Sequence, residues 1–184
     1  ISEFTEKGIK TADGTEHELD VIIFATGFDA VDGNYTRIII KGKNGETLKQ
    51  RWPDGATSYL GISVPDFPNL FMILGPSGPF TNLPPSIETQ VEFIDGLIAH
   101  TRSLSAETDN DGVVEATPEA EQEWAETCDK LSASSLFRRT DSWIFGANIP
   151  GKKKSVLFYF GGLGNYRKVL DNVVNDGYKG YVCY

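Results

Sequence analysis

The stretch Leu74-Gly-Pro-Ser-Gly-Pro-Phe-Thr-Asn-Leu-Pro-Pro-Ser-Ile-Glu88 connects a short apolar run to a segment whose apolar residues have helical spacing. The apolar run, residues 70–74, has the length of a strand, and the helical pattern extends over residues 86–104. Glycines leave the backbone of the connection uncovered, and prolines stiffen it and remove N–H donors. The connection therefore has a fixed shape that suits contact with a flat ligand. A plain strand-to-helix loop is the alternative interpretation.

A second loop of this kind lies upstream. Asp20-Val-Ile-Ile-Phe24 is a β-branched and aromatic run of the type found in buried strands. The small residues Ala25-Thr-Gly27 follow directly, and in open α/β sheets ligands bind where strands end. We therefore expect a ligand to approach the backbone at Thr26 and Gly27, unless this segment is simply a strand followed by a turn.

The rest of the chain mixes strand-like and helical patterns. Turns are predicted at residues 13–14 and 43–45, and strands at residues 35–40, 58–62, 113–116, 142–145 and 155–160. One helix is predicted to begin after Thr117 with Pro118 in its first turn, and another to run from Tyr166 to a stop at Gly177. The predicted helix faces are Ile87, Val91, Ile94 and Ile98, then Ala120, Trp124, Cys128 and Leu131, then Val169, Leu170, Val173 and Val174.

Composition restricts the possible partners. The chain has 184 residues and a net charge of −9, which argues against nucleic acid and anionic membrane surfaces as partners. Its apolar runs are shorter than the ~20 residues of a membrane helix. Cys128 and Cys183 are far apart and lack metal-site spacing, so a reducing, cytosolic setting is expected.

The motifs of common catalytic sites are absent from the sequence. The segment 146–153 nearly matches a P-loop, but it lacks the final hydroxyl residue and leads into a strand-like segment instead of a helix. It remains a basic, glycine-bounded loop that either contacts a phosphate or is solvated. The sequence has no G-x-G-x-x-G motif, no convincing catalytic triad and no metal cluster, and His17 and His100 are isolated. The residues alone therefore indicate ligand-facing loops without a catalytic residue of their own.

Four stretches together resemble the Baeyer–Villiger monooxygenases, and the cyclohexanone monooxygenases most closely. These are residues 20–29, 75–88, 142–153 and 160–163, so the resemblance covers essentially the whole chain. It implies a cytosolic flavoprotein that uses FAD, NADPH and O₂ to insert oxygen beside the carbonyl of a small ketone, giving an ester or lactone.

The resemblance also implies a fold and a place within it. The fold is an α/β flavoprotein with two dinucleotide-binding domains, of which this chain would be the C-terminal third. Residues 1–27 would complete the NADP-binding domain and form the hinge, and residues 28–184 would form the returning part of the FAD-binding domain. The glycine-rich cofactor loops, the family signature and the catalytic arginine would all lie upstream of Ile1.

Several residues match family positions with known roles. Phe80, Thr81, Leu83 and Phe158 match substrate-pocket positions. Asn82 and Leu83 match a segment beside the flavin ring, Thr26 and Gly27 match the hinge near both cofactors, and Trp143 matches a mobile loop that folds over the nicotinamide cofactor. The resemblance assigns no catalytic residue and no metal to this chain.

Two alternatives remain open at this point. One is a flavin monooxygenase that oxygenates nitrogen or sulfur, and the other is a non-catalytic ligand-binding module. The residues around Thr26 do not distinguish the first alternative from a Baeyer–Villiger monooxygenase. Residues 80–88 and Trp143, in contrast, favour the Baeyer–Villiger branch.

Overall fold

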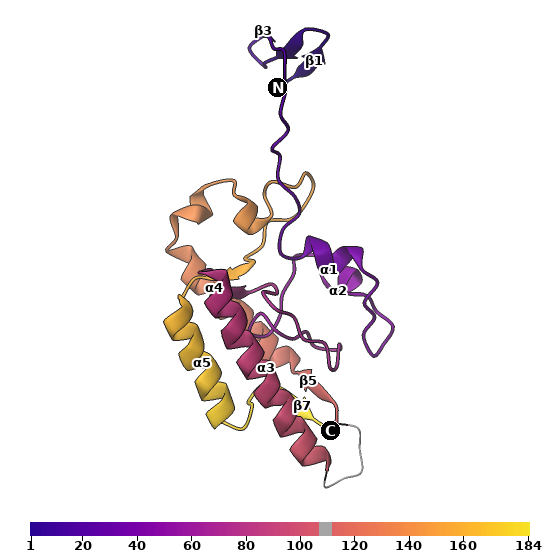
Figure 1. The fold of residues 1–184 in the computed structure, drawn as a ribbon, viewed down its shortest axis with the longest axis vertical. Helices are drawn as coiled ribbons and strands as arrows, with labels where there is room; N and C mark the ends of the chain where they lie inside the picture. Colours follow the sequence, from indigo (N-terminus) through magenta and orange to yellow (C-terminus); the bar gives the residue numbers. More distant parts are fainter. Residues whose placement is uncertain (107–111) are drawn as a thin grey trace.

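The computed structural model describes residues 1–106 and 112–184 (Figure 1). The helices are α1 (Gly33–Arg37), α2 (Leu48–Arg51), α3 (Leu83–Ser105), α4 (Pro118–Ala133) and α5 (Leu163–Asn175), with 3-10 turns η1 (Leu136–Arg139) and η2 (Trp143–Phe145). The strands are β1 (Glu3–Thr5), β2 (Gly8–Lys10), β3 (Glu16–Glu18), β4 (Gly78–Pro79), β5 (Val114–Ala116), β6 (Phe158–Tyr159) and β7 (Tyr181–Cys183). None of the helices in these ranges is long and apolar enough to cross a bilayer.

The first three strands form a small antiparallel sheet that stands apart from the rest of the chain (Figure 1). Phe4 pairs with Ile9, and Ile9 pairs with His17 in the neighbouring strand. The predicted turn at Asp13-Gly14 is confirmed, because it joins β2 to β3 and Gly14 adopts a φ of 86°. An extended segment then leads from this sheet back to the body of the molecule (Figure 1).

The main core lies where α3, α4 and α5 pack with the β5–β7 pair (Figure 1). The predicted helices are confirmed, and their ends follow from local chemistry. Thr117 Oγ1 accepts a hydrogen bond from Ala120 N at 3.2 Å, and Pro118 occupies the first turn of α4. Gly177, with a φ of 69°, lies just beyond the end of α5. The predicted strand at residues 113–116 is also confirmed, as β5.

The buried face of α3 is only in part the one that the sequence predicted, since Ile94 packs against the core. Ile87 and Val91 are 36% and 49% exposed, whereas Phe93 and Leu97 are buried. The buried row also contains Ser86, Thr89, Gln90 and Thr101. These polar residues are buried because they hydrogen-bond within the helix or to neighbouring loops, so the distribution of aliphatic residues alone indicated only part of the buried face.

The predicted buried strand at residues 20–24 is wrong in this structure. The segment is extended, but it forms no ladder with the described residues, and Val21 and Ile23 are 73% and 84% exposed. A strand that is apolar on both faces needs neighbours in its sheet and cover on each face. The part of the chain that the structure describes supplies neither, apart from the ring of Phe4 at 5.7 Å from that of Phe24.

Two further predicted strands are helical turns instead. Residues 35–40 contain the end of α1, where the Tyr35 ring packs edge-on against Trp52 at 6.4 Å. Residues 142–145 contain η2, which begins after Ser142 because its Oγ accepts a hydrogen bond from Ile144 N. In both places a local capping or packing interaction outweighs the β-propensity of the aromatic and branched side chains.

The predicted strands at 58–62 and 70–74 are irregular loops. Leu60 and Leu74 have φ values of 60° and 55°, which interrupt an extended backbone. Only single contacts remain, such as the bridge between Tyr59 and Ser63 and the hydrogen bond from Met72 N to Ile62 O at 2.8 Å. The strand predicted at 155–160 is confirmed only for its two residues in β6.

Candidate functional site

The loop that precedes α3 is fixed to the core as far as Phe80. Ser77 N donates to Leu157 O at 2.8 Å, β4 pairs in parallel with β6, and Phe80 N donates to Tyr159 O at 2.9 Å. Ser77 has a φ of 65°, a conformation that a non-glycine residue rarely adopts. The indole Nε1 of Trp124 donates to Ser77 O at 3.1 Å, so α4 holds this strained turn in place.

A buried polar relay supports the same loop from α3. Gln90 is fully buried, and its Oε1 accepts from Leu74 N at 2.8 Å while its Nε2 donates to the Tyr166 hydroxyl at 3.1 Å. That hydroxyl in turn donates to Leu60 O at 2.6 Å. Burial raises the pKa of Tyr166, so its hydroxyl stays protonated and remains a donor. The relay therefore links two loops to two helices without a charge.

Replacing Gln90 by leucine tests this support. The substitution leaves the Leu74 N–H buried without an acceptor, and we expect the free energy of unfolding to fall by about 1–3 kcal/mol. Gln122→Leu is the matched control, because the exposed Gln122 side chain only bonds Glu126 on the surface of α4. Thermal unfolding of the full-length protein measures both variants. Equal unfolding temperatures for the two variants would show that the relay carries no stability.

Phe80 lies at the centre of an aromatic cluster. Its ring centroid is 5.1 Å from that of Phe158, 5.4 Å from that of Phe160 and 5.9 Å from that of Phe137. Trp143 joins the cluster with its ring perpendicular to that of Phe158 at a distance of 5.9 Å. The structure thus brings together three of the residues that the sequence singled out, Phe80, Phe158 and Trp143.

The other predicted residues of this loop lie just beyond the cluster. Thr81, Asn82 and Leu83 are exposed at the start of α3, and Leu83 is 55% exposed. Asn82 is the N-cap residue, but its side chain makes no capping hydrogen bond. Pro84 and Pro85 follow Leu83, and prolines have no N–H to offer. The surface at this point therefore consists of apolar rings and one polar amide, with few free backbone N–H groups beside them.

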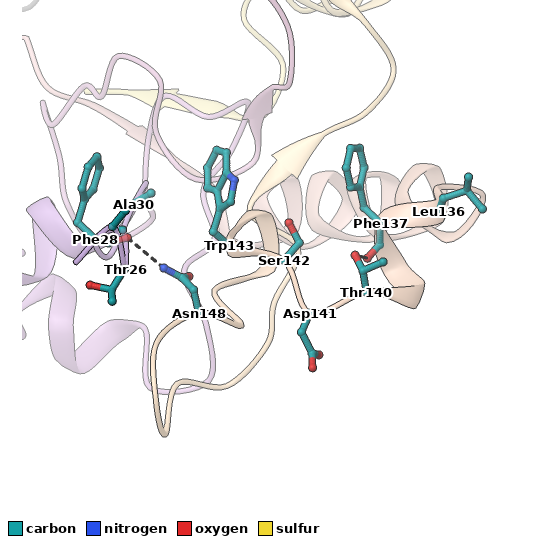
Figure 2. Close-up of a pocket in the computed structure, with 12 residues that line it drawn as sticks. Thr26, Phe28, Ala30, Leu136, Phe137, Thr140, Asp141, Ser142, Trp143 and Asn148 are labelled. Carbon is teal, nitrogen blue, oxygen red and sulfur yellow. Dashed lines mark hydrogen bonds between the residues drawn. The ribbon is translucent and has the colours of Figure 1, made fainter. Parts of the chain in front are cut away.

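Trp143 also forms one wall of a cleft of about 850 Å³ (Figure 2). Thr26 and Gly27 lie on the opposite wall, so the structure places three predicted cofactor residues around one space. The lining residues are Ala25, Thr26, Gly27, Phe28, Ala30, Leu136, Phe137, Thr140, Asp141, Ser142, Trp143 and Asn148. Figure 2 shows the two walls meeting where Asn148 Nδ2 donates to Phe28 O at 3.3 Å.

Sequence reasoning missed some residues of this cleft. Leu136 and Phe137 lie in η1 and Thr140 directly follows it, in a stretch without a periodic pattern. Phe137 touches both the cleft and the Phe80 cluster. An apolar pair after a helix end, Leu136-Phe137 before Arg138, was the only available signal.

The basic loop resembling a P-loop does not form a phosphate cradle. Residues 146–151 make successive turns, and no helix begins directly after them. Lys152 contacts two carboxylates, and Lys153 pairs with Asp54 at the surface. No group of three or more metal-ligating side chains occurs among the residues that the structure describes. The histidines are apart: His17 lies in β3, and the His100 ring is 4.9 Å from that of Tyr178.

Several known monooxygenases are similar in sequence to this chain. No family model matches the chain. It is 52% identical over 98% of its length to a cyclohexanone 1,2-monooxygenase from Acinetobacter sp. and 52% identical over 99% to a Baeyer–Villiger monooxygenase from Pseudooceanicola batsensis. A phenazine N-monooxygenase from Lysobacter antibioticus is 48% identical over the whole chain. The chain spans about a third of the length of these relatives, 32%, 32% and 33% respectively.

Solved structures give the same result for the fold. A closed crystal structure of cyclohexanone monooxygenase superimposes with a TM-score of 0.88 and 57% identity, over 100% of this chain and 34% of that one. A complex of OTEMO with FAD and NADP superimposes with a TM-score of 0.80 and 34% identity, over 100% of this chain and 33% of the other. The arrangement of loops and helices described above is therefore shared with these proteins.

Proposed function

Because this chain belongs to the Baeyer–Villiger monooxygenase family over the third of those proteins that it spans, we propose that it forms one wall of a ketone-oxygenating active site. This proposal rests on the 52% identity, over nearly the whole chain, to proteins named for this chemistry. In the proposed reaction one oxygen atom of O₂ is inserted beside the carbonyl of a small, cyclic ketone, giving an ester or lactone. The enzyme would use FAD and NADPH and work in the cytoplasm.

The residues before α3 fit the flavin. A flavin is flat and has a polar edge, and the exposed Asn82 amide and Leu83 side chain lie next to each other with no capping bond to displace. We place Asn82 and Leu83 against the ring edge, where the amide satisfies polar atoms and the leucine covers an apolar face. When bound and reduced by NADPH, the flavin supplies the oxygen-activating chemistry.

The cleft beside Trp143 fits the nicotinamide cofactor. Its volume of about 850 Å³ accommodates a large part of such a molecule, and its lining is mostly apolar side chains with a few hydroxyl and amide groups and the carboxylate of Asp141. Gly27, with a φ of 74°, leaves its backbone accessible on one wall. In this proposal Thr26 and Gly27 contact the cofactor from one side and Trp143 covers it from the other, which excludes water from the reacting centre.

The aromatic cluster fits the ketone. Phe80 and Phe158 present edge-to-face rings to the same space, and Thr81 and Leu83 extend that surface towards the flavin position. A small cyclic ketone buries apolar carbon against such rings, and its carbonyl stays free to react. These side chains bind and orient the substrate; the proton-transfer and charge-stabilising groups belong to the part of the enzyme outside this chain.

The chain would act as part of a larger polypeptide. In this proposal residues 1–27 complete the NADP-binding domain and the hinge, and residues 28–184 complete the FAD-binding domain. The exposed apolar residues of the segment 20–24 support it, because they require a sheet that the described residues do not provide.

Phe80→Ala and Leu83→Ala in the full-length enzyme test the substrate wall. We expect each to change the ratio of kcat/KM between a six-membered and a larger ring ketone by about 10-fold or more, because each removes apolar contact. Enantioselectivity with a substituted cyclic ketone should change as well. Leu104→Ala is the control, since Leu104 is exposed at the opposite end of α3.

The substrate panel should include a heteroaromatic amine, because one relative is named a phenazine N-monooxygenase. We expect oxygen transfer to the ketones and none to the amine. Unchanged ketone ratios in both the Phe80 and Leu83 variants would remove these residues from the substrate wall. Oxidation of the amine in preference to every ketone would contradict the proposed reaction itself.

A further inference from the structure

Lys152 makes an ion pair with two carboxylates in a largely buried position. Its Nζ lies 2.5 Å from Asp29 Oδ1 and 2.6 Å from Asp32 Oδ1. The exposed fractions of the three side chains are 15%, 24% and 8%. Burial lowers the pKa of Lys152, but hydrogen bonds to Asp29 and Asp32 outweigh it and the net shift is upward, so the ammonium stays charged.

The contact joins the two walls of the Trp143 cleft. Asp29 and Asp32 follow the wall formed by residues 25–28, and Lys152 lies further along the loop that carries Trp143. A second bond, from Asn148 Nδ2 to Phe28 O, connects the same two segments at 3.3 Å (Figure 2). The ion pair of Lys152 and the Asn148 hydrogen bond therefore both connect the Trp143 loop to the opposite wall of the cleft.

The surrounding backbone is shaped for this contact. A Cβ at Gly33 would lie 2.6 Å from Asp29 Cβ, so only glycine allows the first turn of α1 to approach that carboxylate. Gly146 has a φ of 73°, and a Cβ there would lie 3.2 Å from the Lys152 stem. Glycines on both sides therefore make room for the carboxylate and for the lysine stem.

We propose that Lys152 is a positioning residue that holds the Trp143 loop against the segment 25–32, and thereby sets the affinity of the cleft for the nicotinamide cofactor. The inference rests on the proposed function, since it takes the ligand of the cleft to be NADP. Lys152 itself does not line the cleft. It acts through the loop, which returns from Trp143 to Ser155, where Ser155 N donates to Phe145 O at 3.2 Å.

The neighbouring lysine offers a matched control. Lys153 pairs with Asp54 at 2.8 Å, but the two side chains are 63% and 80% exposed. An exposed pair of this kind contributes little, whereas removing one member of a buried pair leaves an uncompensated charge. Lys152→Met and Lys153→Met remove the same charge from adjacent positions, so they differ only in the contact that each breaks.

The experiment measures NADP⁺ binding to the oxidised full-length enzyme by titration, together with FAD content and hydrogen peroxide release during NADPH oxidation without ketone. We expect Lys152→Met to raise the Kd for NADP⁺ at least about fivefold, within the usual range for coupling between sites. It should also raise peroxide release, because a loosened loop admits water. Lys153→Met should resemble the wild type in both measurements. FAD content should be equal in all three.

Further variants separate positioning from folding. Lys152→Arg should recover part of the lost affinity, and Asp32→Asn combined with Lys152→Met should cost less than the sum of the single changes. If Lys152→Met loses FAD or fails to fold, Asn148→Ala tests the same connection without leaving a buried charge, and we expect it to raise the Kd about threefold, a typical effect of losing one hydrogen bond.

Equal Kd values in Lys152→Met and Lys153→Met would overturn the inference, as would an unchanged Kd in Asn148→Ala if only that variant folds. In either case a wild-type enzyme that still binds NADP⁺ and oxidises ketones leaves the proposed function standing. A wild-type enzyme that binds no NADP⁺ would instead contradict the proposed function.

Discussion

Replacing Trp124 by alanine is expected to lower the free energy of unfolding by about 3–5 kcal/mol, the usual cost of removing a large buried aromatic side chain. Trp124 is 5% exposed and its ring stacks on Tyr159 at 4.8 Å. The change also removes the indole N–H from Ser77 O, which releases the strained turn before β4. Thermal or denaturant unfolding of the full-length protein, followed by tryptophan and flavin fluorescence, measures the loss.

Trp143→Ala is the matched control for stability. Its side chain is 47% exposed and lines the cleft, so its removal should change the unfolding temperature little. A Trp124 variant as stable as the Trp143 variant would show that the turn is held by other contacts. Because the turn leads directly to Phe80, the Trp124 variant should also bind ketones more weakly at temperatures well below its unfolding.

Residues 1–184 expressed alone should be poorly soluble and should bind no flavin. The reason is the exposed apolar residues of the extended segment and of the proposed cofactor-facing surfaces. Seven of these side chains are each at least 47% exposed: Val21, Ile23, Phe24, Phe28, Leu83, Leu136 and Trp143. An extended apolar edge of this kind pairs with other chains. Sedimentation of the lysate and the absorbance of any purified protein in the flavin band measure the outcome.

A charged variant separates the two parts of this prediction. Val21→Lys combined with Ile23→Lys should increase the soluble fraction, because the unpaired segment no longer associates. It should remain colourless, since the substitutions supply no flavin-binding surface. A soluble, cooperatively folded and yellow preparation of the unmodified chain would contradict the prediction and favour an independent ligand-binding module.

The three long helices, α3, α4 and α5, could be predicted because their information is local. Thr117 and Pro118 mark the start of α4, and Gly177 marks the end of α5, within one turn of each helix. Most of the strands could not, because a strand forms only with a partner. The run at residues 20–24 has a strand composition but no neighbour among the described residues, and residues 70–74 are turned by the φ of Leu74.

Parts of the candidate site could likewise be predicted from the sequence, and other parts could not. The composition of the loop before α3 indicated a surface for a flat ligand, and the family resemblance supplied the roles of Phe80, Asn82 and Leu83, which remain predictions. The cluster of Phe80 with Phe137 and the pairing of Lys152 with Asp32 depend on residues far apart in the chain. Sequence patterns with short periods carry no information about such contacts, so only the structure could show them.

The parallel pairing of Gly78 with Phe158 has a consequence for how the protein folds. These partners are separated by about 80 residues, so the chain must pay the entropy of closing a long loop before the contact forms. The helices α3 and α4 lie within that loop and can form early from local contacts. The aromatic wall around Phe80 should therefore be completed late in folding. Mutations that slow helix packing would delay this wall most, even when they lie far from it.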